Sequence, residues 1–129
     1  MNQSENIQDL IKALISAQQE FETINKNLTG QAGQGKFKYA DLTEVYNKTK
    51  PALFKHGLTC MGLLRGNKEG GDYLSLTLYH TSGQFIKSEI EFRYNEKPTN
   101  MGAFLTYMRR YLYSSMLNIA ADEDVEGMT

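Results

Sequence analysis

The chain has 129 residues and a mass of 14.7 kDa, a length that predicts one domain. Apolar residues make up 40% of the chain and charged residues 22%, which is the balance of a folded protein and excludes an extended disordered one. No run of apolar residues approaches the ~20 needed to cross a membrane, and the first ten residues lack the pattern of a secretory signal. The single cysteine, Cys60, excludes an internal disulfide and a thiolate metal cage, so we expect a soluble cytoplasmic protein with no membrane partner.

The net charge of −1 conceals an uneven distribution along the chain. Residues 26–68 carry eight basic and two acidic side chains, whereas residues 1–25 and the last 18 residues carry an excess of acids. A polyanion responds to local rather than net charge, so this basic middle segment favours a nucleic-acid partner. A chance cluster of solvated lysines explains the same pattern, and charge alone does not separate the two interpretations.

Two helices are predicted in the N-terminal half of the chain. Apolar residues recur at helical spacing over residues 7–21, behind Ser4 or Asn6 as the cap. The polar, glycine-containing residues 25–34 then predict a flexible loop. Asp41 caps a second helix that ends near residue 56, before a glycine suited to a left-handed terminating position. The proline at position 51 predicts a kink or a break in this helix.

Three strands are predicted next, over residues 58–64, 73–80 and 85–94, of which the second and third show clear period-two alternation. The connecting segments NKEGG and HTSGQ are short and contain glycine. The strands are therefore expected to form an antiparallel meander, of which one face has to be buried against another element.

A final helix over residues 101–119 is predicted to pack on that face. Apolar side chains surround most of its circumference, apart from a polar stripe formed by Thr106, Arg109, Arg110, Tyr113 and Ser114. A helix of this kind is buried on more than one side. One side of this helix is expected to pack on the sheet. The other side packs either on another copy of the chain or on the first helix of the same copy.

The sequence contains no catalytic constellation and no cofactor motif. His56 and His80 stand apart from each other and from Cys60, so the ligand spacing of a zinc site is missing. The glycines of residues 30–35 have the spacing of a phosphate-binding loop, but Lys36 is followed by phenylalanine instead of serine or threonine. We therefore expect neither an ATPase nor a bound cofactor. The four acids within residues 122–126 could hold a divalent cation, but a solvated acidic tail is the favoured interpretation.

Basic residues are interleaved with aromatic ones in two segments, residues 36–39 (KFKY) and residues 107–113 (YMRRYLY). Lysine and arginine neutralise phosphates, and aromatic faces stack exposed bases without reading their sequence. This chemistry suits single-stranded nucleic acid. Tyrosines on a helix more often belong to a core, so neither segment is specific by itself.

Six motifs occur in order along the chain: YADL at residues 39–42, PAL at 51–53, HGL at 56–58, LYHTSG at 78–83, MGAFLTYMRRY at 101–111 and ADED at 121–124. The fifth contains the pattern G-[SA]-x-x-T-Y-x-R-R-Y, which is the specific one, and the others support it. Together the motifs resemble the ERF (essential recombination function) family of phage single-strand annealing proteins, over roughly residues 7–127.

The resemblance implies an α+β domain over residues 1–120, in which two N-terminal helices precede a three-stranded antiparallel meander backed by a long helix. Residues 121–129 would form an acidic tail, where longer family members continue into a divergent C-terminal region. It also implies rings or filaments that bind single-stranded DNA and anneal complementary strands without nucleotide hydrolysis, during phage recombination in the bacterial cytoplasm. A host single-strand binding protein is a further expected partner. The residues expected to contact DNA are Lys36, Lys38, Tyr39, Arg93, Lys97, Thr106, Tyr107, Arg109 and Arg110.

Two other functions stay open at this point. A metal-dependent nuclease would use Asp72, Glu89 and Glu91 together with acids of the tail. Glu89 and Glu91 share a predicted strand face with Lys87 and Arg93, an arrangement that paired surface charges explain equally well. The other alternative is a structural assembly protein without DNA activity, in which the paired arginines only bridge subunits.

Overall fold

The structure of the protein, a computed structural model, describes residues 2–32, 35–66, 71–93 and 98–122. Within these residues it contains three helices and two antiparallel sheets, which confirms the predicted α+β class. In chain order the elements are α1 (Gln8–Gln19), β1 (Leu28–Ala32), β2 (Gly35–Tyr39), α2 (Leu42–Lys55), β3 (Leu58–Gly66), β4 (Asp72–His80), β5 (Phe85–Phe92) and α3 (Pro98–Leu117).

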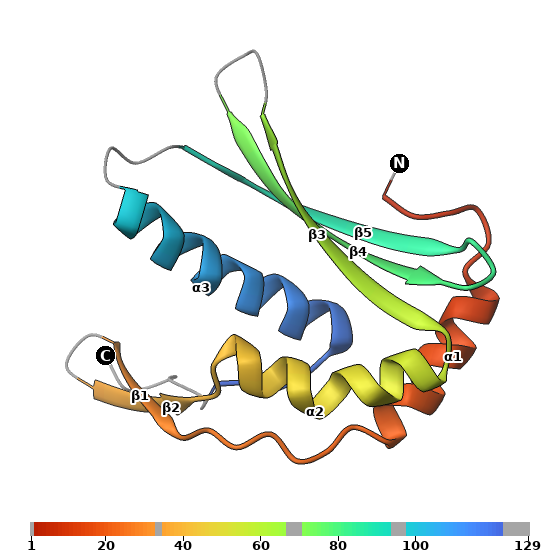
Figure 1. Ribbon diagram of the computed structural model, residues 1–129, viewed down its shortest axis with the longest axis horizontal. Coiled ribbons are helices and arrows are strands. Elements are labelled where there is room, and N and C mark those ends of the chain that lie inside the picture. The colour runs from red at the N-terminus through yellow and green to blue at the C-terminus, as the bar shows by residue number, and fades with distance from the viewer. Residues whose placement is uncertain (1, 33–34, 67–70, 94–97, 123–129) are drawn as a thin grey trace.

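The larger sheet has the strand order β3-β4-β5, so each strand pairs with its neighbour in sequence. Alternation along β4 places Leu74, Leu76 and Leu78 on the face that packs against the helices, and all three are buried. Figure 1 shows α3 running diagonally below this face, with α2 and the smaller sheet on the far side of α3. The molecule therefore has the three-stranded sheet on one side, α3 in the middle, and α2 with the β1–β2 hairpin on the other.

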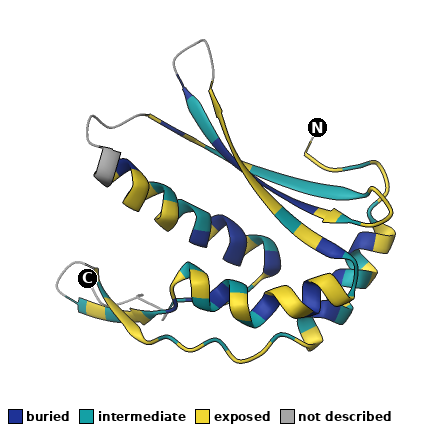
Figure 2. Ribbon diagram, viewed as in Figure 1, coloured by how far each residue is buried: buried dark blue, intermediate teal, exposed yellow. Residues whose placement is uncertain are grey.

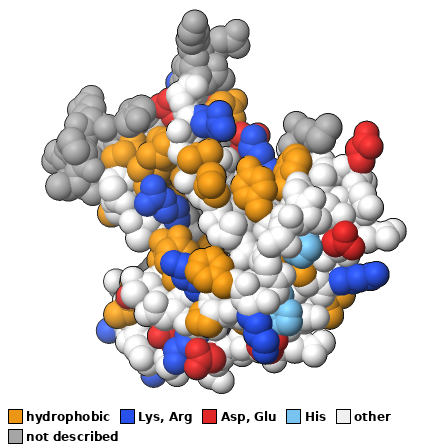
Figure 3. Space-filling model, turned by 45° about the vertical axis from the view of Figure 1, so that its right-hand side comes forward, with side chains coloured by type: hydrophobic (Ala, Val, Ile, Leu, Met, Phe, Trp, Pro, Cys, Tyr) orange, Lys and Arg blue, Asp and Glu red, His pale blue; other side chains and the backbone are white. Residues whose placement is uncertain are grey.

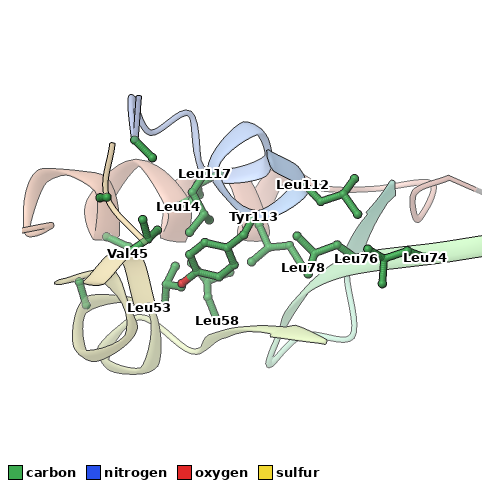
Figure 4. Packing of buried hydrophobic residues seen from close by; sticks show 14 of the residues in the cluster. Leu14, Val45, Leu53, Leu58, Leu74, Leu76, Leu78, Leu112, Tyr113 and Leu117 are labelled. Atoms are coloured by element: carbon green, nitrogen blue, oxygen red, sulfur yellow. The ribbon is translucent and has the colours of Figure 1, made fainter. Parts of the chain in front are cut away.

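The hydrophobic core lies where α1, α2, α3 and the sheet meet. Leucines from each of these elements surround the ring of Tyr113, which is almost fully buried on α3 (Figure 4). The Tyr113 hydroxyl makes a 2.6 Å hydrogen bond to the buried hydroxyl of Thr49 on α2. A buried phenol needs such a partner, and this bond ties α2 to α3.

The prediction of a flexible loop over residues 25–34 is wrong. Residues of β1 pair with β2 in an antiparallel hairpin, in which Gly30 lies opposite Phe37. The β1 sequence LTGQA has too few apolar residues to show alternation, so its strand character depends on the pairing with β2. The basic segment KFKY accordingly lies on a strand and not on a loop.

The second helix follows its predicted limits. The Asp41 carboxylate accepts a 2.9 Å hydrogen bond from the backbone N–H of Glu44, as an N-cap should, and Gly57 follows the helix with φ of +73°. Pro51 lies inside α2, which continues from Leu42 to Lys55 without a break. The carbonyl that lacks a donor because of Pro51 belongs to Asn47, and Asn47 is exposed and can be hydrated.

The last helix begins three residues earlier than predicted, at Pro98, where the missing N–H of proline costs no hydrogen bond. Its predicted polar stripe is mostly buried, because Arg110, Tyr113 and Ser114 face the rest of the molecule. Figure 2 shows this burial concentrated in the C-terminal half of α3. In the described ranges, no helix combines the length and apolar character needed to span a bilayer.

Candidate nucleic-acid interface

The hairpin β1–β2 and α3 enclose a cavity of about 390 Å³ at one end of the molecule. Burial alternates along β2, so that the rings of Phe37 and Tyr39 line the cavity while Lys36 and Lys38 are exposed on the opposite face of the hairpin. From α3, the lining includes Tyr107 and Arg110. The structure thus brings the aromatic residues of the first segment together with Tyr107 and Arg110 of the second, and leaves the two lysines on the other face of the hairpin.

Arg110 is the centre of this arrangement and is only 6% exposed. Its guanidinium carbon lies 4.7 Å from the ring centre of Tyr39, 5.1 Å from that of Tyr111 and 5.7 Å from that of Tyr107. Guanidinium groups at such distances from aromatic rings are attracted to the negative ring faces. Arg110 therefore holds three tyrosines from two elements around one positive charge.

The same guanidinium forms an ion pair with the carboxylate of Asp122. Asp122 also accepts a 3.3 Å hydrogen bond from the hydroxyl of Tyr111. The backbone supports this placement, since Asp122 forms an isolated bridge with Tyr39 and the N–H of Ala40 donates to the carbonyl of Ala121 at 2.8 Å. Asp122, expected to begin a solvated tail, is instead engaged by α3.

The charge of Arg109 acts on a different neighbour, Tyr46 of α2. Arg109 is half-buried, and it lies one turn before Tyr113, whose ring stacks edge-on against Tyr46 at 4.7 Å between centres. Burial raises the pKa of the Tyr46 phenol, and the positive charge of Arg109 acts in the opposite direction. Of the two adjacent arginines of α3, Arg110 contacts the rings around the hairpin, and Arg109 acts on Tyr46 through its charge.

The remaining predicted DNA-binding residues lie at the periphery. Thr106 is exposed on α3 and also lines the cavity, and Arg93 is exposed just after β5. Lys97 lies outside the described residues. Next to Thr106, the exposed rings of Phe104, Tyr107 and Tyr111 share one face of α3 at spacings of three and four residues; we call these three residues the aromatic platform.

Sequence reasoning missed a second basic and aromatic group on α2. Tyr46, Lys50 and Phe54 are spaced four residues apart, so they share one face of the helix, and the Lys50 ammonium lies 5.5 Å from the centre of the Phe54 ring. This spacing was visible in the sequence. It was not recognised because the three members of this group are separated by three residues each, whereas the basic and aromatic residues of KFKY alternate directly.

The acids named for a nuclease are separated by the sheet. Glu89 and Glu91 lie opposite Ser75 and Tyr73 on the outer face, whereas Asp72 lies opposite Phe92 in the alternation of the inner face. Among the residues that the structure describes, no three histidine, cysteine or acidic side chains come together as metal ligands would. The tail acids after Asp122 are outside these residues.

A sequence model described as the ERF superfamily matches residues 10–128 of the chain, which is nearly its whole length. No curated protein and no solved structure matches the chain significantly.

Proposed function

Because the chain belongs to the ERF superfamily, we propose that it binds single-stranded DNA and anneals complementary strands without nucleotide hydrolysis, as an oligomer acting in phage recombination. The observation that carries the proposal is the aromatic platform beside the cavity of the hairpin. Its rings are exposed although they are large and apolar, and bases of a single strand can stack on such rings whatever their sequence.

Arg110 acts in this proposal as a positioning residue. Its guanidinium lies against two rings of the platform, Tyr107 and Tyr111, whose centres are 4.6 Å apart, and against Tyr39 across the cavity. Rings fixed in advance lose little entropy when bases stack on them. The buried arginine thus prepares the aromatic surface, and other cations contact the phosphates.

Those other cations are Lys36 and Lys38 on the exposed face of the hairpin, together with Arg109 on α3. A protein that neutralises several phosphates releases the counterions condensed on DNA, so its affinity falls steeply as salt increases. Replacing both lysines with alanine should weaken binding of single strands and reduce the salt dependence, while leaving the fold intact because both side chains are exposed.

Annealing requires a surface that holds one strand and leaves its bases available to a second. The free energy comes from base pairing, so no acid, base or nucleophile is needed. The separation of Asp72 from the outer-face acids supports this function over the nuclease.

Exposed apolar surface supports the oligomeric part of the proposal. Met61 and Leu63 are exposed on the outer face of β3, which is the edge strand of its sheet within the described part of the chain. At the other edge, the N-terminal residues cover part of β5, where the N–H of Ser4 donates to the carbonyl of Phe85 at 3.0 Å. An open edge beside apolar side chains is the kind of surface that a neighbouring subunit covers.

One experiment separates the three functions. The protein is mixed with fluorescently labelled complementary oligonucleotides, with and without Mg²⁺ and without ATP. We expect faster duplex formation in both conditions. Shortened oligonucleotides in Mg²⁺ would identify a nuclease, and an assembled protein that neither binds nor anneals would identify a structural role. Light scattering of the DNA-free protein tests assembly, because a particle of 14.7 kDa would contradict it.

A further inference from the structure

A second cavity, of about 230 Å³, opens between α2, the start of β3 and the buried side of α3. Its walls are largely apolar and aromatic, with the rings of Tyr46, Phe54 and Tyr113 on two sides and Cys60 of β3 on a third. Burial raises the pKa of the Cys60 thiol to about 12, so this wall is uncharged at neutral pH. We call this cavity the α2–β3 cleft. It is separate from the cavity of the hairpin, since the two share no lining residue.

The α2–β3 cleft combines aromatic walls with positive charge at its mouth. Phe54 is 56% exposed although it is a large apolar side chain, and the Lys50 ammonium lies 5.5 Å from its ring centre. Arg109 does not line the cleft, although its positive charge acts on Tyr46 and opposes the rise in the pKa of that phenol. The lining residues of the cleft include no acid. In the view of Figure 3, hydrophobic and basic side chains lie next to each other across the middle of the molecule.

We propose that the α2–β3 cleft is a second base-binding site for single-stranded DNA, in which one base stacks against Phe54 and Tyr46 while Lys50 contacts a neighbouring phosphate. The occupant follows from the chemistry of the cleft. A planar aromatic group suits its walls, and the Lys50 ammonium beside Phe54 favours a group that is attached to an anion. The inference rests on the proposed binding of single-stranded DNA.

A glycine in the wall of the cleft allows a direct test. A Cβ added to Gly62 would meet neighbouring atoms only at 3.6 Å or more, so the Cβ of Gly62→Val fits at the cleft without a clash. Gly66 is the matched control, because it lies on the same face of β3, tolerates a Cβ equally well and does not line the cleft. We expect Gly62→Val to lower the affinity for single-stranded oligothymidylate about fivefold or more, the effect of one lost stacking contact, and Gly66→Val to leave it unchanged.

A second test removes the ring instead of filling the space. Phe54→Ala is compared with Ile15→Ala on α1, where the isoleucine is 51% exposed and does not line the cleft. Each variant is measured with oligothymidylate and with an abasic oligonucleotide of the same length. Phe54→Ala should lower the affinity for oligothymidylate about fivefold and leave the affinity for the abasic strand unchanged, because only stacking is lost.

The outcomes distinguish this inference from the proposed function. If the unmodified protein binds and anneals single strands while Gly62→Val and Phe54→Ala both match their controls, the base-binding site is wrong and the proposed function stands. If the two variants lower the oligomeric mass without changing the affinity for DNA, the cleft seats another copy of the chain, and the inference is overturned. If the unmodified protein binds no single-stranded DNA, the proposed function is wrong, and so is this inference, which rests on it. Circular dichroism of every variant confirms that it is folded.

Discussion

Replacing Arg110 with alanine should destabilise the protein far more than replacing Arg109. Arg110 is buried, it pairs with Asp122, and it contacts three tyrosine rings. Removing one partner of a buried ion pair costs about 3–5 kcal/mol, because the other charge is left without compensation. The Asp122 side chain is 23% exposed and can be partly hydrated, so we expect a loss near the lower end, about 3 kcal/mol.

Urea unfolding followed by circular dichroism, at one protein concentration, measures this loss. A slope of about 1–3 kcal/mol/M is usual for a small protein, so the midpoint should fall by about 1 M or more. Arg109→Ala is the control on the neighbouring position and should cost about 1 kcal/mol or less, because Arg109 is only half-buried. Arg110→Lys keeps the charge but loses the planar group that fits between rings, so it should lie between the two.

The opposite result would refute the reasoning about Arg110. If Arg110→Ala unfolds at the same urea concentration as the unmodified protein but loses affinity for single-stranded DNA, its guanidinium contacts phosphate directly. The double variant with Asp122→Asn provides a further check. If the ion pair is formed as the structure shows it, the two single losses should add up to more than the loss of the double variant.

Three other predictions concern the hairpin, the core and acid stability. A Cβ at Gly30 would lie 2.6 Å from the ring of Phe37, so Gly30→Ala should displace this ring and weaken DNA binding, and unchanged affinity would show that the ring is not needed. Tyr113→Phe removes the buried hydrogen bond to α2 and should cost about 1 kcal/mol in urea unfolding, whereas no loss would mean that the bond contributes nothing. Hydrogen bonds from Lys55 and the adjacent histidine hold the pKa of Glu20 below 4.5; Glu20 therefore stabilises the folded state above pH 4.5, and this contribution disappears as the pH falls. Melting temperatures of Glu20→Gln and the unmodified protein should differ at neutral pH and converge in acid, and a constant difference would contradict the assignment.

The features predicted correctly from the sequence are those that neighbouring residues determine. Asp41 caps α2 through an N–H three residues away, and alternation over residues 72–80 is sufficient to identify β4. The hairpin was missed because the apolar face of β2 consists of only two residues, Phe37 and Tyr39, and β1 has no apolar alternation of its own. Its stability comes from pairing and from contact with α3, which are not local properties.

The candidate sites likewise depend on contacts between residues that are far apart in the sequence. The sequence identified the two arginines of α3 as important, but it could not show that one is buried, because the burial of Arg110 depends on Tyr39 from the hairpin and on Asp122 from the end of the described chain. The α2–β3 cleft needs α2, β3 and α3 to meet. Only its α2 side, with Tyr46 and Phe54 eight residues apart, could have been found from spacing.

The division between the two arginines follows from helix geometry. Successive residues of a helix point about 100° apart, so adjacent side chains point in different directions. On α3 the guanidinium of Arg110 lies against Tyr39 of the hairpin, whereas the charge of Arg109 acts on Tyr46 of α2. If both cavities bind bases, the strand has to pass α3, since one cavity lies at the hairpin and the other between α2 and β3. Arg109 lines neither cavity, but its charge acts on Tyr46 in the wall of the α2–β3 cleft. Reversing its charge should weaken binding of strands long enough to reach both cavities more than binding of strands that reach only one, whereas a simple phosphate contact would weaken both equally.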